Sequence, residues 1–137
     1  MSSIYQDIFD NLSRPFTIKD FTWHINAPEY KCSDIEIGIK VESLFQRLDE
    51  VLGANNWQLK YPHPNGYCVD LGLRFSSEWT WKSGWGSSPT SAIQQAAAVL
   101  GMCNRKPVFF MRNFPLKNGV LSLLDKENIM AMMMQEN

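Results

Sequence analysis

The sequence predicts an α+β domain in which a three- to four-stranded antiparallel β-meander packs against an alanine-rich helix. Between residues 57 and 86, three segments alternate apolar and polar residues and are separated by turn residues, a pattern typical of antiparallel strands. Directly after them, Ser88-Pro89 begins an alanine-rich segment that ends at Gly101. A serine followed by proline favours a helix start, and so many alanines allow the helix to approach a sheet or a neighbouring chain closely.

The first half of the chain predicts a helix, a strand and a second helix. Residues 3–12 place apolar side chains at helical spacing, and Arg14-Pro15 ends this helix because a residue before proline is disfavoured in helical conformation. Residues 16–25 alternate and predict a strand. Residues 35–53 carry an apolar stripe at spacings of three and four, which predicts a helix that Gly53 terminates.

The second half predicts three strands, the alanine-rich helix and a tail. The strands are expected at 57–61, 67–75 and 78–86. Residues 102–117 contain four cations and no acid, and residues 121–134 predict a last helix. We therefore expect one domain over residues 1–137, with a core at about 15–105 and a C-terminal basic segment and helix at 106–137.

Composition and charge narrow the classes of function. The net charge of −1 argues against a dedicated nonspecific phosphate binder, although it leaves room for a local basic stripe. Three cysteines without a Cys-x-x-Cys pair indicate free thiols in a reducing compartment. The sequence contains no apolar run of membrane-spanning length and no signal-peptide pattern at its start, so we expect a cytoplasmic location, in the nucleoid or in a host cell, and no membrane partner.

The sequence offers no recognisable catalytic or cofactor motif. Neither a nucleophile elbow nor a phosphate-binding glycine loop is present. His63 and Cys68 are close in sequence, but zinc requires about four ligands, and a histidine beside a turn is the simpler interpretation. The glycine-rich segment 84–88 precedes a helix and would suit an anion, although a hairpin exit and a capped helix explain it equally. We expect no enzyme activity, no metal and no cofactor.

Five tryptophans and the basic stretch leave two interpretations open. Nucleobases stack on aromatic rings while phosphates pair with Lys or Arg, so Trp81-Lys82 and the segment 105–112 are candidates for binding a single strand. The alternative is that tryptophans alternating along a strand belong to the core and that the cations form a solvated face. Spacing alone favours this second interpretation.

Two motifs in the same order carry a family resemblance. The segment RLDEVLGANNWQLKYP (47–62), followed by strands and then by SPTSAIQQAAAVLGM (88–102), resembles the Rad-fifty-two/Rad-twenty-two family of single-strand annealing proteins. The upstream FTWHI (21–25) is similar to the family's first strand, and the resemblance covers about residues 15–105. The first motif matches the family at Arg47, Leu48, Asp49, Glu50, Gly53, Asn56 and Trp57.

This resemblance implies a non-catalytic protein of homologous recombination or DNA repair, of the kind that phages and mobile elements encode. It would bind and anneal single-stranded DNA as a homo-oligomer, in a ring, with the strand extended along a basic groove and its bases presented for pairing. The DNA-binding residues that we expect, chosen mostly by charge, are Lys40, Lys60, Arg74, Lys82, Arg105, Lys106 and Arg112.

Departures from the family pattern support a second hypothesis. The family's Lys-Arg pair falls on Gln94 and Gln95, and a family cation falls near Glu42, so part of the phosphate-binding set is replaced. The chain would then be an annealing-protein-like scaffold that has lost DNA binding and acts as a protein-binding inhibitor or adaptor. The methionine-rich end, which would suit an adaptable protein interface, comprises Met130, Met132, Met133 and Met134.

Overall fold

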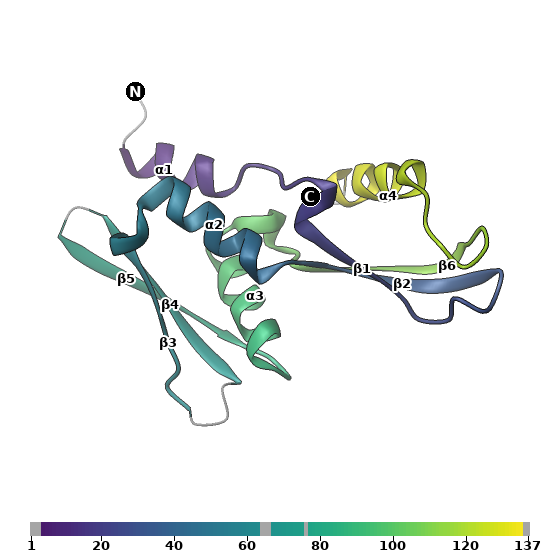
Figure 1. Cartoon of the computed structure of the whole chain (residues 1–137). Helices are drawn as coiled ribbons and strands as arrows, with labels where there is room; N and C mark the ends of the chain where they lie inside the picture. The colour runs from purple at the N-terminus through teal and green to yellow at the C-terminus, as the bar shows by residue number, and fades with distance from the viewer. Residues whose placement is uncertain (1–3, 64–66, 76, 136–137) are drawn as a thin grey trace. The chain divides into compact units, whose positions relative to one another are not determined.

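The computed structural model describes residues 4–63, 67–75 and 77–135, without the side chains of residues 75, 104, 105 and 135. Within these residues the predicted α+β class is confirmed: α-helices accompany two three-stranded antiparallel sheets (Figure 1). The chain divides into two compact units. Unit 1 comprises Met1–Pro15 and Val41–Pro107, and unit 2 comprises Phe16–Lys40 and Val108–Asn137.

Unit 1 contains the meander that the sequence predicts. Its strands β3 (Trp57–Lys60), β4 (Cys68–Phe75) and β5 (Glu78–Trp85) pair in that order, each antiparallel to the next. Its helices are α1 (Ile4–Leu12), α2 (Val41–Leu52) and α3 (Pro89–Val99). Alternate β4 residues Val69, Leu71 and Leu73 are at most 1% exposed and form the centre of the core. Part of the turn predicted before β4, residues 64–66, lies outside the described residues.

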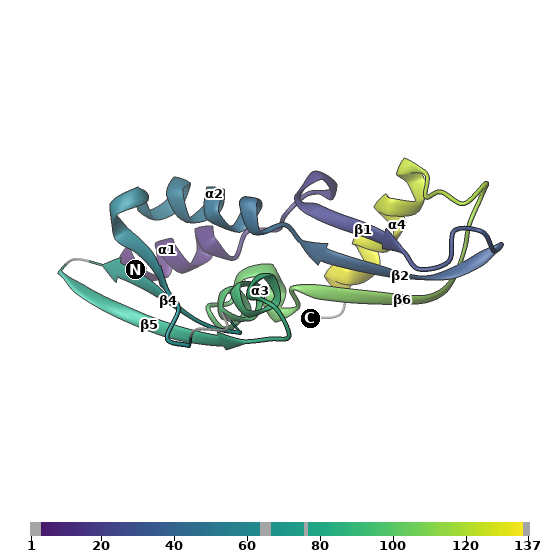
Figure 2. The same ribbon diagram turned by 60° about the horizontal axis from the view of Figure 1, so that its bottom comes forward.

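Helix α3 packs across β4 and β5, as the alanine pattern predicts (Figure 2). The Ser88 hydroxyl accepts a hydrogen bond from the Ser91 amide, and the Ser91 hydroxyl accepts one from the Ser88 amide, which closes a capping box. Gly101 ends the segment with a φ of +93°, a conformation that glycine adopts without steric cost. The alanines Ala92, Ala96 and Ala97 are at most 1% exposed, so their small side chains set the close helix-to-sheet distance.

Arg47 joins α2 to the end of α1. Although it carries a charge, it is only 9% exposed. Its Nη1 donates to the carbonyl oxygens of Leu12 at 3.0 Å and Arg14 at 2.8 Å, with a longer contact to Asn11 at 3.4 Å. The last carbonyls of a helix have no partner within the helix. The first residue of the family-like motif therefore has a structural role in this chain.

Unit 2 contains two strands, β2 (Cys32–Ile39) and β6 (Val108–Pro115), that were not predicted from the sequence. Its sheet has the order β1 (Phe21–Ile25), β2, β6, and α4 (Leu123–Gln135) completes the unit. The helix predicted over 35–53 is wrong in its first part, because residues 35–39 belong to β2 and α2 begins only at Val41. The basic stretch assigned to the tail contains β6, which is paired with β2.

The strand predicted over 16–25 is correct only from Phe21 onward. Before it, Ile18–Asp20 form a 3-10 turn. The Asp20 carboxylate accepts hydrogen bonds from the Thr17 amide at 2.8 Å and from the Thr17 hydroxyl at 3.1 Å. This local capping competes with an extended backbone and explains why the strand begins late.

Candidate functional site

The sheet of unit 1 has one covered and one open face. The residues of β4 that pack under α3 alternate with residues that point the other way. The register places Arg74 opposite Trp79, Gly72 opposite Trp81, and Cys68 opposite Trp85. No described helix of unit 1 covers this second face (Figure 2). We call the surface formed by these residues together with Lys60, Asp70 and Ser83 the tryptophan face.

Two cations lie over two of the tryptophan rings. The Nζ atom of Lys60 is 4.3 Å from the ring centre of Trp81, and the guanidinium carbon of Arg74 is 5.2 Å from that of Trp79. The two indoles are themselves stacked, with centroids 5.7 Å apart and an interplanar angle of 24°. A cation over an indole face is attracted by the ring quadrupole, so these contacts fix the side chains in a ladder.

Arg74 is also held from the side. Its Nε donates to the Asn56 side-chain oxygen at 3.0 Å, and one terminal nitrogen donates to the Asn55 carbonyl at 3.0 Å. Asn56 is itself fixed by a 2.8 Å bond from its amide nitrogen to the Leu52 carbonyl. The guanidinium is therefore pre-positioned before any ligand arrives, which lowers the entropy cost of a contact.

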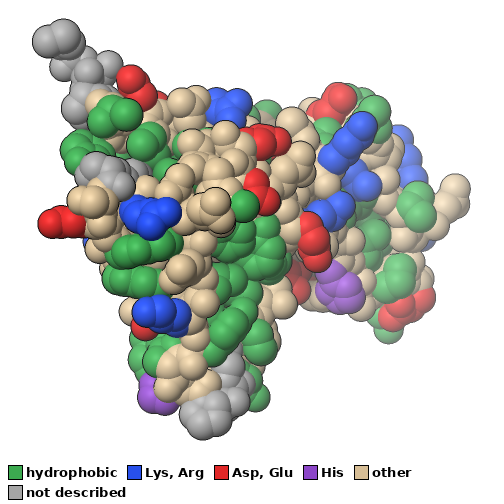
Figure 3. Space-filling view, turned by 60° about the vertical axis from the view of Figure 1, so that its left-hand side comes forward, with side chains coloured by type: hydrophobic (Ala, Val, Ile, Leu, Met, Phe, Trp, Pro, Cys, Tyr) green, Lys and Arg blue, Asp and Glu red, His purple; other side chains and the backbone are tan. Residues whose placement is uncertain are grey.

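The other end of the tryptophan face is more open. Trp85 is 63% exposed, and the His63 ring lies 5.3 Å from it at an angle of 48°. Between the two ends, the Ser83 hydroxyl donates to the Asp70 carboxylate at 2.7 Å. Figure 3, which brings the left-hand side of Figure 1 forward, shows hydrophobic side chains with Lys or Arg among them in this region.

Of the seven cations predicted from the sequence, the structure brings Lys60 and Arg74 together on the tryptophan face. Lys82 lies on the opposite face of the same sheet, because it stands opposite Leu71 in the register and lines a pocket with residues of α1 and the end of α3. The pairing of Trp81 with Lys82 as one binding element is therefore wrong: consecutive strand residues point to opposite faces.

Lys40, Lys106 and Arg112 are not among the residues that form the tryptophan face. Lys40 belongs to unit 2, where its Nζ donates to the Lys19 carbonyl at 2.8 Å, and Arg112 lies exposed on β6 of the same unit. Lys106 is exposed and follows the 3-10 turn Met102–Arg105 of unit 1. The side chain of Arg105 lies outside the described residues.

The cysteine on the tryptophan face is protected. Cys68 is 2% exposed, and burial raises the pKa of its thiol, with the Asp70 carboxylate adding to the increase. Among the residues that the structure describes, no group of three or more His, Cys, Asp or Glu could hold a metal ion. The pair His63 and Cys68 therefore has no further ligands among them.

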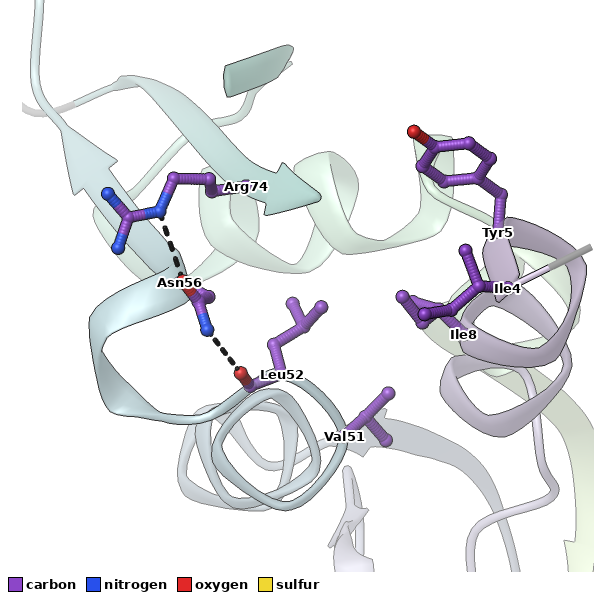
Figure 4. Close-up of a pocket in the computed structure, with 7 residues that line it drawn as sticks. All are labelled: Ile4, Tyr5, Ile8, Val51, Leu52, Asn56 and Arg74. Atoms are coloured by element: carbon purple, nitrogen blue, oxygen red, sulfur yellow. Dashed lines mark hydrogen bonds between the residues drawn. The ribbon is translucent and has the colours of Figure 1, made fainter. Parts of the chain in front are cut away.

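A pocket of about 280 Å³ lies beside Arg74 (Figure 4). Ile4, Tyr5 and Ile8 of α1 form one wall, and Val51, Leu52 and Asn56 form the other. Ile4 is 70% exposed, so the pocket is an open apolar depression at the surface. Two of its polar groups, Asn56 and Arg74, already bond to each other, and its described lining supplies no cluster of reactive side chains.

Unit 2 has exposed apolar residues at the start and end of α4. They are Val120, Leu123, Leu124, Met132 and Met134, each between 45% and 65% exposed. Among the described side chains of this helix, Ile129 alone is fully buried, and Lys126 lies over the Trp23 ring at 5.7 Å. None of the helices in the described ranges has the length and apolar character needed to cross a membrane.

Comparisons with known proteins return no relative. No family model matches the chain, and neither the curated proteins nor the solved structures contain a significant match. Arguments about function therefore depend on the residues and their geometry.

The sequence alone is enough to place the tryptophans of β5 on one face of the sheet. It does not tell which face of the sheet is exposed. Alternation alone places Trp79, Trp81 and Trp85 on one face, and it also separates Lys82 from them. Which face of the sheet is covered depends on where α3 packs. The signal for that is Gly84: it lies on the covered face, where its lack of a side chain admits the helix.

Proposed function

We propose that this chain is a non-catalytic protein that binds and anneals single-stranded DNA, as a divergent relative of the Rad-fifty-two/Rad-twenty-two family. The observation that supports this function best is the tryptophan face, where Lys60 and Arg74 accompany three tryptophans on a sheet surface that no described helix of unit 1 covers. Aromatic rings that stack with bases, combined with cations that pair with phosphates, form the usual surface for sequence-tolerant binding of a single strand.

In this proposal the chain performs no bond-making chemistry. Lys60 and Arg74 pair with phosphates of an extended strand, and most bases remain free to pair with a complementary strand. Arg74 is suited to this role because Asn55 and Asn56 hold its guanidinium in place. Fixed geometry lowers the ordering cost that a flexible surface cation would bring.

The test is binding of a fluorescent oligonucleotide at low and at moderate salt. We expect binding at low salt that weakens as salt increases, because each neutralised phosphate releases counterions. Lys60→Glu should weaken it, whereas Lys82→Glu, which changes the opposite face of the same sheet, should have little effect. Failure to bind at low salt would eliminate the annealing function.

We further propose that the chain acts as a homo-oligomeric ring in the cytoplasm or nucleoid, as the family resemblance suggests. Annealing brings two strands together, and several binding faces in one assembly hold them at high effective concentration. Light scattering of the purified chain tests the assembly, and a strict monomer at all concentrations would contradict it.

A second function, protein binding as an inhibitor or adaptor, is favoured by the exposed apolar residues of unit 2. Leu123 is 65% and Leu124 is 64% exposed, and adjacent apolar side chains of this size are typical of interaction surfaces when they form a patch. This function predicts no oligonucleotide binding at low salt. The same assay therefore separates the two proposals.

A further inference from the structure

The three tryptophans of the tryptophan face differ in how much of their rings is available. Trp79 and Trp81 are half-buried, stack on each other and have Arg74 and Lys60 over their rings. Trp85 is 63% exposed and stands outside this ladder. A ligand base would have to displace a cation to stack on Trp79 or Trp81, whereas the Trp85 ring is open to it.

The surroundings of Trp85 suit one planar group. Its neighbour across the sheet is the small Cys68, which is only 2% exposed, so the exposed Trp85 is the large side chain that this pair of positions presents to a ligand. The His63 ring approaches at 5.3 Å with a tilt of 48° and supplies a second aromatic edge. Behind Trp85, the Gly86 amide donates to the Tyr67 carbonyl at 3.0 Å, so the backbone that carries the indole is anchored.

Charge on the same face is too low for phosphate contacts to supply most of the affinity. Among its described residues, the cations are Lys60 and Arg74, and the acidic Asp70 stands directly opposite Lys60 in the register. Two cations allow about two phosphate contacts, each of which adds about −0.7 to the salt slope of a single strand. A strand held by so few phosphates requires a further attraction, and base stacking is the one that exposed indoles provide.

We propose that Trp85, with His63 beside it, is an anchor for one nucleobase per chain. This inference rests on the proposed function and specifies how the strand is held: one base stacks on Trp85, while Lys60 and Arg74 bind phosphates farther along the face. Because the other two indoles are covered by cations, the neighbouring bases stay unstacked and available for pairing.

The test compares an oligothymidylate with an abasic strand of the same length. We expect the abasic strand to bind about 5- to 150-fold more weakly, the range for loss of one base–aromatic stack. Trp85→Ala should weaken oligothymidylate binding by a similar factor without affecting the abasic strand. Trp85→Phe, which retains a ring, should recover most of the loss. Tyr30→Ala removes an equally exposed aromatic residue of unit 2 and should change nothing.

The possible outcomes distinguish the base anchor at Trp85 from the proposed binding of single-stranded DNA. Equal affinity for the two strands would overturn the anchor and leave DNA binding intact. A chain that binds neither strand would instead refute the proposed function. If Trp85→Ala unfolds the chain, Trp85→Leu, which keeps an apolar side chain but no ring, decides the question: a base anchor requires it to lose most of the preference for oligothymidylate over the abasic strand, and an unchanged preference in this folded variant would overturn the anchor.

Discussion

The six-membered ring of Trp81 lies directly on Gly72 of the neighbouring strand. A Cβ built at Gly72 would come within 2.6 Å of Cζ3 and 2.7 Å of Cε3 and Cη2 of that ring. From β3, on the other side of β4, the Lys60 ammonium lies 4.3 Å from the same ring. The absence of a side chain at position 72 therefore allows Trp81 to lie across β4 and reach the cation on β3.

Gly72→Ala should displace the Trp81 indole and loosen its contact with Lys60. Overpacking of this kind usually costs about 1–3 kcal/mol, against a gain of about 0.5–1 kcal/mol from replacing glycine within a strand. We expect a net loss of stability in denaturant titration. In a Trp81→Ala background the same change should be neutral or stabilising, and an equal cost in both backgrounds would show that the two residues are not coupled.

Gly84→Ala should be more damaging, because the obstacle is backbone. A Cβ at Gly84 would collide with the Ala92 carbonyl oxygen and the Ala96 amide of α3, neither of which can rotate away. We expect a loss of about 3 kcal/mol or more in the free energy of unfolding. Gly101→Ala is the control: nothing lies within 4 Å of the added atom, so only the strain of its φ of +93° remains, about 1–2 kcal/mol.

The sequence predicts the elements of unit 1 better than those of unit 2, because the boundaries between elements are more clearly marked there. In unit 1 the change from strand to helix coincides with Ser88-Pro89, and each period is separated from the next by turn residues. In unit 2 the alternating Ile35, Ile37 and Ile39 continue into the helical stripe of α2 after Lys40 alone. Because the two patterns follow each other so closely, the predicted helix was extended backward to residue 35, and this part of β2 was predicted as helix.

The strand within the basic segment 102–117 was not predicted, for a different reason. The apolar residues Val108 to Met111 of this segment begin β6, whose partner residues in β2 lie about 70 to 80 positions earlier in the chain. Pairing over such a separation leaves no local signal, and an expected helix at 35–39 removes the partner strand altogether. The candidate site was limited in the same way: choosing cations by charge gave Lys60 and Arg74 together with Lys82 of the covered face, Lys106 of unit 1 and residues of unit 2.

Arg47 should contribute to stability rather than to DNA binding. Replacing it with Met removes the donor to the Leu12 and Arg14 carbonyls and leaves those oxygens without that partner at the end of α1. We expect a loss of about 1.5–3 kcal/mol in the free energy of unfolding, the usual contribution of a hydrogen bond to a charged group. Gln46→Met, one position earlier and exposed, should change stability by less than about 0.5 kcal/mol. Oligonucleotide affinity of the folded Arg47→Met variant should be unchanged.

Cys68 should make the folded state sensitive to alkaline pH. Burial, and then the Asp70 carboxylate, raise the pKa of its thiol above the ordinary 9.0. The folded chain therefore retains this proton at a pH where the unfolded chain has released it. The contribution to stability is complete below pH 9 and decreases as pH rises toward the folded-state pKa. Denaturant titrations at a series of pH values should show a smaller loss of unfolding free energy at alkaline pH for Cys68→Ala than for the unchanged chain.

Thiol alkylation at pH 8 should modify the exposed Cys32 long before Cys68. Equal alkylation rates, or identical pH profiles of stability for the two chains, would contradict the protected thiol.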